Sequence, residues 1–171
     1  MLKIIKGEPK HCELIAKIGK ETFLESHGES ASKEDINTFI SKTYTKDKLC
    51  KELENPTIEY HIIYYKNKVA GYSKIELNIP NTTIEHTNIT KLDRFYLLKE
   101  FYGLQLGKVL VDFNIELSKK NLQKGMWLAV WIENKRAIKF YSKNGFKIVG
   151  KYDFQISKTH SNPNHIMYLA Y

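Results

Sequence analysis

A strand, a helix and a second strand follow one another between residues 89 and 132, and this unit constrains the fold more than any other segment. The stretch ITKLDRFYLL predicts a strand, because β-branched and aromatic residues dominate it. The stretch GMWLAVWI is apolar at successive positions, which is typical of a strand covered on both faces. A helix between two such strands predicts a right-handed crossover and a parallel pair.

The remaining segments predict further strands and helices around this unit. Apolar periodicity and turn signals indicate further strands over residues 2–7, 58–65, 69–79, 146–154 and 165–171, and further helices over residues 9–23, 45–55 and 134–144. The polar segment from residue 25 to residue 44 predicts a loop and a short helix. The expected fold class is a mixed α/β (α+β) layer structure, with helices on both faces of one sheet.

Length and composition are those of an ordinary globular chain. The 171 residues suggest a single domain over residues 1–171, with 42% hydrophobic and 27% charged residues. No apolar run approaches the roughly 20 residues that cross a bilayer. The first ten residues lack the apolar core of a signal peptide. We therefore expect a cytoplasmic protein without a membrane partner.

The net charge of +8 comes from Lys residues that are spread along the whole chain. A solvated surface is the simplest interpretation, and an anionic cofactor is the alternative that bears on function. No nucleic-acid-binding motif accompanies the charge, so we expect no nucleic-acid partner. Cys12 and Cys50 belong to no metal-binding pattern, and we expect no metal. Cys12 fits a small packing residue in a helix, with a catalytic cysteine as the alternative.

The stretch FYGLQLGKVL stands where the strand of the central unit gives way to its helix. The first amides of a helix lack internal partners and the helix dipole is positive there, so such a turn can bind an anion. Gly103 and Gly107 would let the backbone approach a phosphate closely, and Lys108 adds a charge. An ordinary strand-to-helix turn is the competing interpretation. In the helix that follows, Leu106, Val109, Leu110, Phe113 and Leu117 are expected on one apolar face.

Together with this turn, the stretch NKRAIKFYSKNGF resembles the GNAT superfamily of N-acetyltransferases. The family's helix pattern N-x-x-A-x-x-x-Y-x-x-x-G-F is matched at Asn134, Ala137, Tyr141, Gly145 and Phe146. The stretches IGKETFLESHG and YTKDKLCKELENP are similar to the bacterial spermidine/spermine acetyltransferase subgroup.

The family's phosphate loop, Q/R-x-x-G-x-G/A, is matched less well. Tyr102 stands at its first position and Gln105 at the position of its middle glycine, while Gly107 fills the last. We expect Gln105 to adopt helical backbone angles, where a side chain costs nothing.

The resemblance implies one mixed seven-stranded sheet in which two central parallel strands splay apart. It implies acetyl-CoA as co-substrate, direct attack by an amine, and Tyr141 as the acid that protonates the departing thiolate. The residues that it assigns to cofactor binding are Phe95, Tyr96, Leu97, Gly103, Leu104, Gln105, Leu106, Gly107, Lys108, Asn134, Ala137, Tyr141 and Lys143.

The favoured acceptor is a polyamine or a similar small amine. Because such a cation needs carboxylates, Glu25, Glu29 and Glu76 are the predicted acceptor-binding residues; Glu25, Glu76 and Asp93 are also candidates for the base. Surface charges are the competing interpretation of each. Acetylation of a protein N-terminus or lysine is one alternative function, and a non-catalytic CoA-binding regulatory protein is another. A homodimer is left open.

Overall fold

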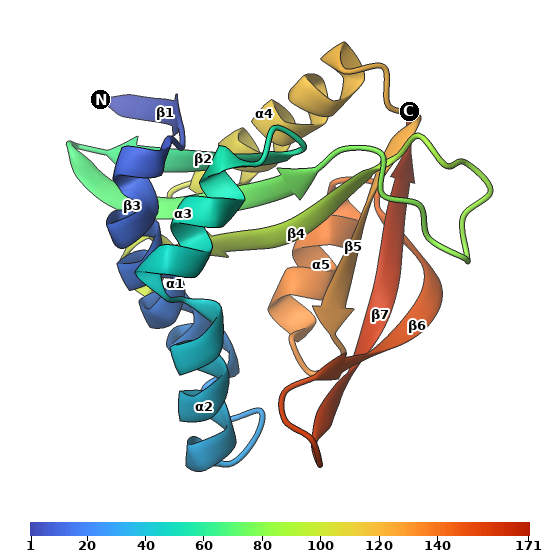
Figure 1. The fold of residues 1–171 in the computed structure, drawn as a ribbon. Helices are drawn as coiled ribbons and strands as arrows, with labels where there is room; N and C mark the ends of the chain where they lie inside the picture. The colour runs from blue at the N-terminus through green and yellow to red at the C-terminus, as the bar shows by residue number, and fades with distance from the viewer.

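A seven-stranded sheet with the order β1-β2-β3-β4-β5-β7-β6 runs through the computed structural model, which describes residues 1–171 (Figure 1). The strands are β1 (Leu2–Lys6), β2 (Ile58–Tyr65), β3 (Lys68–Glu76), β4 (Thr90–Leu97), β5 (Gly125–Trp131), β6 (Lys147–Gln155) and β7 (Ser161–Ala170). All neighbours are antiparallel except β4 and β5, which are parallel.

The two parallel strands pair only where they begin. Thr90 lies opposite Met126 and Lys91 opposite Trp127, after which β4 and β5 diverge. The later part of β4 therefore has no ladder partner on the side of β5. The predicted mixed sheet with a central splay is confirmed.

Five α-helices and two short 3-10 turns complete the chain. They are η1 (Pro9–His11), α1 (Cys12–His27), α2 (Lys33–Thr43), α3 (Lys46–Glu54), η2 (Lys99–Phe101), α4 (Leu106–Lys120) and α5 (Lys135–Lys143). Figure 1 shows α1 and α3 on one face of the sheet and α4 and α5 on the other. None of the helices combines the length and the apolar composition that a membrane-spanning segment needs.

Side-chain caps fix where several helices begin. The Thr45 hydroxyl accepts a hydrogen bond from the amide of Lys48, and the Asn134 side chain accepts one from the amide of Ala137. Each bond satisfies a donor that the first helical turn leaves free. The Asn134 cap sets the direction in which α5 leaves β5, and so places the residues of the first turn of α5 beside the splay.

The buried face of α4 differs from the predicted apolar face. Val109 and Phe113 are 37% and 36% exposed. Polar Asn114 and Ser118 are buried instead, because they reach across to the sheet: Asn114 pairs with Ser73 on β3, and Ser118 Oγ lies 2.6 Å from Thr90 Oγ1 on β4. These bonds rotate α4 away from the orientation that apolar spacing alone predicts.

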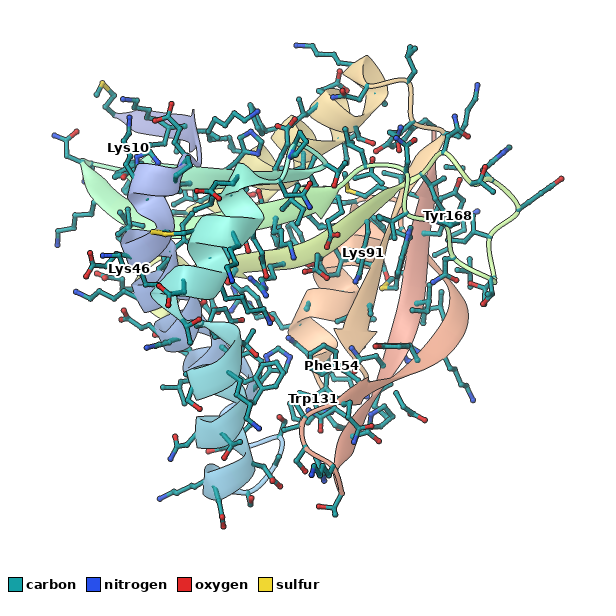
Figure 2. All side chains as sticks on the ribbon, in the orientation of Figure 1. Lys10, Lys46, Lys91, Trp131, Phe154 and Tyr168 are labelled. Carbon is teal, nitrogen blue, oxygen red and sulfur yellow. A yellow bond between two sulfur atoms is a disulfide. The ribbon has the colours of Figure 1, made fainter.

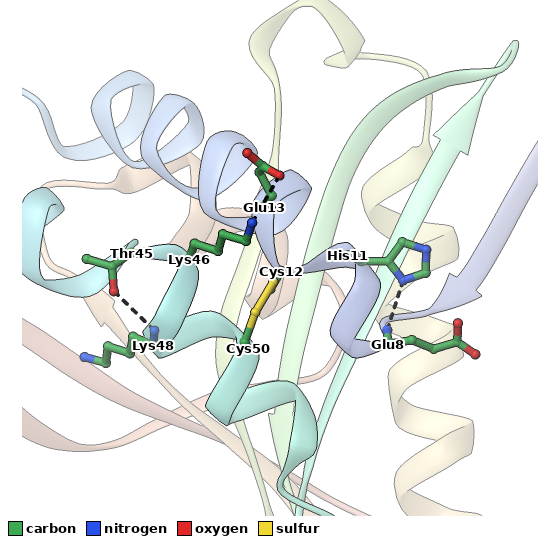
Figure 3. Close-up of a disulfide and its surroundings, with 8 residues drawn as sticks. All are labelled: Glu8, His11, Cys12, Glu13, Thr45, Lys46, Lys48 and Cys50. Atoms are coloured by element: carbon green, nitrogen blue, oxygen red, sulfur yellow. Dashed lines mark hydrogen bonds and ion pairs between the residues drawn. A yellow bond between two sulfur atoms is a disulfide. The ribbon is translucent and has the colours of Figure 1, made fainter.

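A disulfide joins Cys12 at the start of α1 to Cys50 on α3 (Figure 2), and Figure 3 shows the two helices that it connects. The two Cα atoms are 4.9 Å apart. Lys46 and Glu13 form an ion pair between the same helices. Cys12 is buried in the core, as predicted, but it also carries a covalent bond that the sequence reading did not foresee.

Candidate active site

The divergence of β4 and β5 opens a cleft of about 390 Å³ in the centre of the sheet. Phe95, Tyr96 and Leu97 line it from β4, and the last residues of β5 line it from the other side. The end of α1, the first turns of α5 and parts of β6 and β7 close the remaining walls. Both strands thus present unpaired backbone and side chains to the same space.

A bulge in β4 places the carboxylate of Asp93 at this cleft. Lys74 pairs with Arg94 and Ile75 with Leu92, so Asp93 is an extra residue in the ladder. Asp93 Oδ2 lies 3.0 Å from Lys74 Nζ, and Oδ1 lies 2.7 Å from Lys91 Nζ. Burial alone would raise the pKa of Asp93, but Lys74 and Lys91 outweigh it and hold the pKa well below its usual range. Asp93 is therefore a fully paired carboxylate.

Tyr141 projects from α5 into the core beside the splay. Its ring centroid lies 6.1 Å from that of Phe95 on β4 and 5.6 Å from that of Phe146. Burial raises the pKa of the phenol above its ordinary value, and no charged group contributes to the change. The hydroxyl is therefore protonated at neutral pH, and it donates no hydrogen bond to another group of the chain.

The turn before α4 adopts a left-handed conformation, which corrects the expectation for Gln105. Gln105 has φ 61° and ψ 9°, and Gly103 has φ 82°. Helical angles were expected at Gln105. The chain instead turns sharply between η2 and α4 at the position where the phosphate-loop pattern has a glycine, a residue that suits these angles better.

Gly107, in the first turn of α4, lines the cleft. A Cβ atom there would lie 3.4 Å from the ring of Phe140 and would project toward the cleft wall. The charge of Lys108 is taken up by an ion pair with Asp112 one turn later. The groups of this turn that are free to bind an anion are therefore backbone amides of the first helical turn, more than the side chain of Lys108.

The sequence profile of the acetyltransferase (GNAT) family matches residues 21–146. This range contains the second half of α1, the splayed strands, the α4 turn and the pattern on α5. The chain belongs to the acetyltransferase (GNAT) family. Its enzyme class is that of the N-acetyltransferases.

Individual relatives agree with this GNAT assignment. An uncharacterized N-acetyltransferase of Lactobacillus delbrueckii subsp. lactis is 31% identical over 144 residues, which cover 84% of this chain and 83% of the relative. A spermidine N(1)-acetyltransferase of Thermoplasma acidophilum is 27% identical over 86% of this chain and 89% of its own length. The crystal structure of the PaiA N-acetyltransferase from Thermoplasma acidophilum in complex with coenzyme A shares the fold, with a TM-score of 0.79, 23% identity and coverage of 100% and 99% of the two chains.

Some of the residues that the GNAT resemblance assigned to the cofactor lie together in the cleft. Those that line it are Phe95, Tyr96, Leu97, Gly107, Asn134, Ala137 and Tyr141. Those outside its lining are Gly103, Leu104, Gln105, Leu106, Lys108 and Lys143. Leu106 is buried in the core, whereas Lys143 is exposed at the end of α5.

The predicted acceptor carboxylates lie outside the cleft lining. Glu25 accepts a hydrogen bond from the backbone amide of Lys99, with a distance of 3.0 Å. Glu76 forms an ion pair with Lys74, and Glu29 is exposed beyond the end of α1. Asp93 is the carboxylate that lines the cleft.

Aromatic side chains take the place of carboxylates at the end of the cleft that faces α1. Phe23 and His27 line it from α1, and Trp131 and Phe154 from the sheet. Figure 2 shows Trp131 and Phe154 near each other on the C-terminal strands, on the side of the first helices. The sequence predicted that Trp131 lies in a strand covered on both faces, and it placed His27 in a polar segment. Trp131 belongs to no motif. His27 lies in the stretch IGKETFLESHG, but the resemblance of that stretch assigned no role to it.

Proposed function

We propose that this GNAT enzyme transfers the acetyl group of acetyl-CoA to the primary amine of a small molecule, with polyamines as the first acceptors to test. The observation that carries the proposal is the cleft between β4 and β5, with Tyr141 on one wall and unpaired β4 backbone on the other. The spermidine acetyltransferase among the relatives supports the choice of polyamines.

The residues around the cleft fit acetyl-CoA. The peptide-like arm of the cofactor can pair with the free edge of β4 beyond Lys91, as an added strand would. The N-terminus of α4, a helix of 15 residues, supplies amides and a positive dipole for the phosphates. Gly107 keeps this approach free of a side chain.

The cofactor supplies an activated acyl group as a thioester. Backbone amides at the splayed end of β4 are available to donate to the oxyanion that forms when the amine attacks, and such a donor is typically worth about 3 kcal/mol. Tyr141 holds a proton on its hydroxyl for the departing sulfur. The apolar lining excludes water from the reacting atoms, which strengthens both interactions.

The aromatic end of the cleft suits an amine on an alkyl chain. The rings of Phe23, Trp131 and Phe154 can bury methylene groups and can face a cationic group with their π-systems. We propose that Glu25 and Glu29 bind a distal ammonium group of a long polyamine outside the cleft. Glu76 is the weaker candidate, because Lys74 already neutralises it.

A cytoplasmic location is part of the same proposal, because it rests on the use of acetyl-CoA. The Cys12–Cys50 disulfide is the observation against which this location should be tested, since disulfides are rare in the cytosol. Alkylation of the protein immediately on cell lysis, followed by mass spectrometry, would show whether the two thiols are free there.

An acceptor screen tests the proposed activity. The protein is incubated with acetyl-CoA and spermidine, spermine, amino acids or short peptides, and free thiol is measured. Thiol release with the polyamines, above the hydrolysis seen without an acceptor, supports the proposal. Release with peptides alone would make the enzyme a protein acetyltransferase. Tight binding of acetyl-CoA without release for any amine would favour a regulatory CoA-binding protein.

A further inference from the structure

His27 connects α1 to both splayed strands at the aromatic end of the cleft. Its ring stacks on Phe23, with centroids 5.0 Å apart and an interplanar angle of 13°. It lies 5.8 Å from the ring of Trp131 on β5 and meets the ring of Tyr96 on β4 edge-on at 6.1 Å. Packing on three elements fixes the position of the imidazole.

The hydrogen bonds of Ser26 determine which nitrogen of His27 carries the proton. Ser26 Oγ lies 2.7 Å from the carbonyl oxygen of Thr22 and 2.7 Å from His27 Nδ1. A carbonyl can only accept, so the single hydroxyl proton of Ser26 goes to Thr22. Ser26 Oγ must then accept from His27, and Nδ1 carries the hydrogen. Nε2 is left with the lone pair.

Nε2 of His27 is available to a bound molecule. Nδ1 is turned to its own helix, and Nε2, on the far side of the ring, has no hydrogen-bond partner in the chain and is not among the buried unpartnered atoms. The ring lines the cleft. Asp93 is the other side chain in the cleft lining that could accept a proton, but one of its oxygens is paired with Lys74 and the other with Lys91. His27 is therefore the unoccupied basic group of the cleft.

The surroundings keep this imidazole neutral. Burial lowers the pKa of His27 to about 4, and no charged group contributes. The groups that pack against it are Phe23 on α1, Tyr96 on β4 and Trp131 on β5. Tyr96 is the titratable one, and burial raises the pKa of its phenol well above the ordinary value, so it is uncharged as well. The lone pair on Nε2 is free at neutral pH.

We propose that Nε2 of His27 accepts the proton that the acceptor nitrogen releases when the amide forms, an assignment that rests on the proposed function. The uncharged amine attacks the carbonyl carbon, a C–N bond forms and the C–S bond breaks. The nitrogen, positive after the attack, passes one proton to Nε2, while the sulfur takes one from the Tyr141 hydroxyl. Solvent returns the proton from His27 to Tyr141, so the chain ends as it began.

A base this weak is sufficient for that step. A nitrogen that is both protonated and part of a forming amide is a far stronger acid than an imidazolium, so the transfer is downhill. Transfer of a proton from a free ammonium ion to Nε2 of His27 would, by contrast, be strongly unfavourable in free energy. The acceptor must then enter the reacting position uncharged, and kcat/KM should rise with pH through the pKa of the amine itself.

The variant His27→Phe tests the assignment, because it keeps a ring between Phe23 and Trp131 and removes both nitrogens. We expect kcat to fall about a hundredfold, the lower end of what general acid–base groups contribute, with an unchanged KM for acetyl-CoA. Added imidazole should restore part of the rate to His27→Ala. The control is His61→Phe, a substitution at a buried histidine that lies outside the cleft, and it should keep the wild-type kcat.

Nitrogen-15 NMR of the imidazoles gives a readout that does not depend on turnover. We expect the Nδ1–H tautomer for His27 in the wild type, and loss of that preference in Ser26→Ala. An Nε2–H tautomer, or a His27→Phe variant with wild-type kcat and no rescue by imidazole, overturns the assignment while the proposed function stands. If the wild type acetylates no amine at all, the proposed function fails and the assignment fails with it.

Discussion

The guanidinium group of Arg136 lies over the ring of Tyr102, with its carbon 3.3 Å from the ring centroid. The two residues come from the first turn of α5 and from the loop before α4, and both line the cleft. The contact therefore joins the two segments that carry the family's patterns. Tyr102 stands where the phosphate-loop pattern has a Gln or Arg, and Arg136 brings a guanidinium group to this position from the neighbouring helix.

We predict that Arg136→Ala weakens acetyl-CoA binding about tenfold, or ~1.4 kcal/mol. Arg136→Lys should recover only part of this loss, because an ammonium does not stack on a ring as a guanidinium does. Calorimetric titration with acetyl-CoA measures both. Lys139→Ala, a charge change further along α5 and outside the cleft lining, is the control. Equal affinities for the wild type and Arg136→Ala would show that the pair only packs the two segments together.

Substitution of Gly107 tests the phosphate turn. A valine at this position should fit the fold, because its Cβ would meet Phe140 at an ordinary contact distance of 3.4 Å. Its branches would occupy the approach to the amides of α4, and hydrogen bonds to charged groups are worth about 1.5–3 kcal/mol. We expect Gly107→Val to bind acetyl-CoA at least tenfold more weakly than the wild type. The control Val109→Ala, in the same helix, should bind acetyl-CoA with unchanged affinity. A folded Gly107→Val with normal affinity would mean that the turn has no part in binding.

The order of strands and helices along the chain followed from the sequence, because each strand and helix of the central unit has a strong local signal. Two features, one of a helix and one of a strand, did not follow. The rotation of α4 depends on Asn114 and Ser118, which bond to Ser73 and Thr90 in distant strands. The last strand was expected over residues 165–171, but β7 begins at Ser161, and its pairing with β6 places Pro163 opposite Asp153. Contacts between segments override local patterns in both cases.

The cofactor side of the site was partly predictable for the same reason. Asn134, Ala137 and Tyr141 belong to one continuous pattern, and all line the cleft. The acceptor side is assembled from separate elements. The predicted helix ended at Phe23, yet α1 continues to His27, held by the bond from Ser26 to Thr22 and by the stacking of His27 on Phe23. That extra turn carries His27, the base proposed for the acceptor.

The left-handed backbone at Gln105 gives a stability prediction. Left-handed backbone angles destabilise a residue that has a Cβ atom by roughly 1–2 kcal/mol. Glycine avoids this strain, but it loses more conformational entropy on folding, which costs roughly 0.5–1 kcal/mol relative to other residues. We therefore expect Gln105→Gly to raise the free energy of unfolding by about 0.5–1 kcal/mol in urea titrations. Glu21→Gly, at an exposed position inside α1, should lower it by about 1 kcal/mol. A loss of stability in Gln105→Gly would contradict the left-handed assignment.

The role of Tyr141 is tested by removing one oxygen. Tyr141→Phe keeps the ring that packs against Phe95 and Phe146, so the fold and acetyl-CoA affinity should survive. We expect kcat to fall about a hundredfold with little change in the acceptor's KM, as when an interaction made only in the transition state is lost. Tyr168→Phe, which removes a hydroxyl outside the cleft lining, is the matched control. Wild-type turnover by Tyr141→Phe across the pH range would leave Tyr141 as a packing residue.

The buried, neutral state of His27 makes the protein less stable in acid. The pKa of this imidazole is about 4 in the folded chain, against 6.5 as the ordinary value. Between these two values the unfolded chain binds more protons than the folded one, so the free energy of unfolding decreases as the pH falls from 6.5 toward 4. The contribution of His27 reaches roughly 3 kcal/mol at the lower limit.

Urea titrations at several pH values between 7 and 4.5 test this acid sensitivity directly. His27→Phe cannot titrate, so its free energy of unfolding should fall less steeply with decreasing pH than that of the wild type. His61→Phe should also make the free energy of unfolding less dependent on pH. Burial, and to a smaller extent the nearby charge of Lys6, lowers the pKa of His61 to about 4 as well. Identical slopes for the wild type and His27→Phe would show that the imidazole has the same pKa in the folded and in the unfolded chain. The ring would then take up a proton as the pH falls through about 6.5, and the cleft would not be what keeps its Nε2 lone pair free.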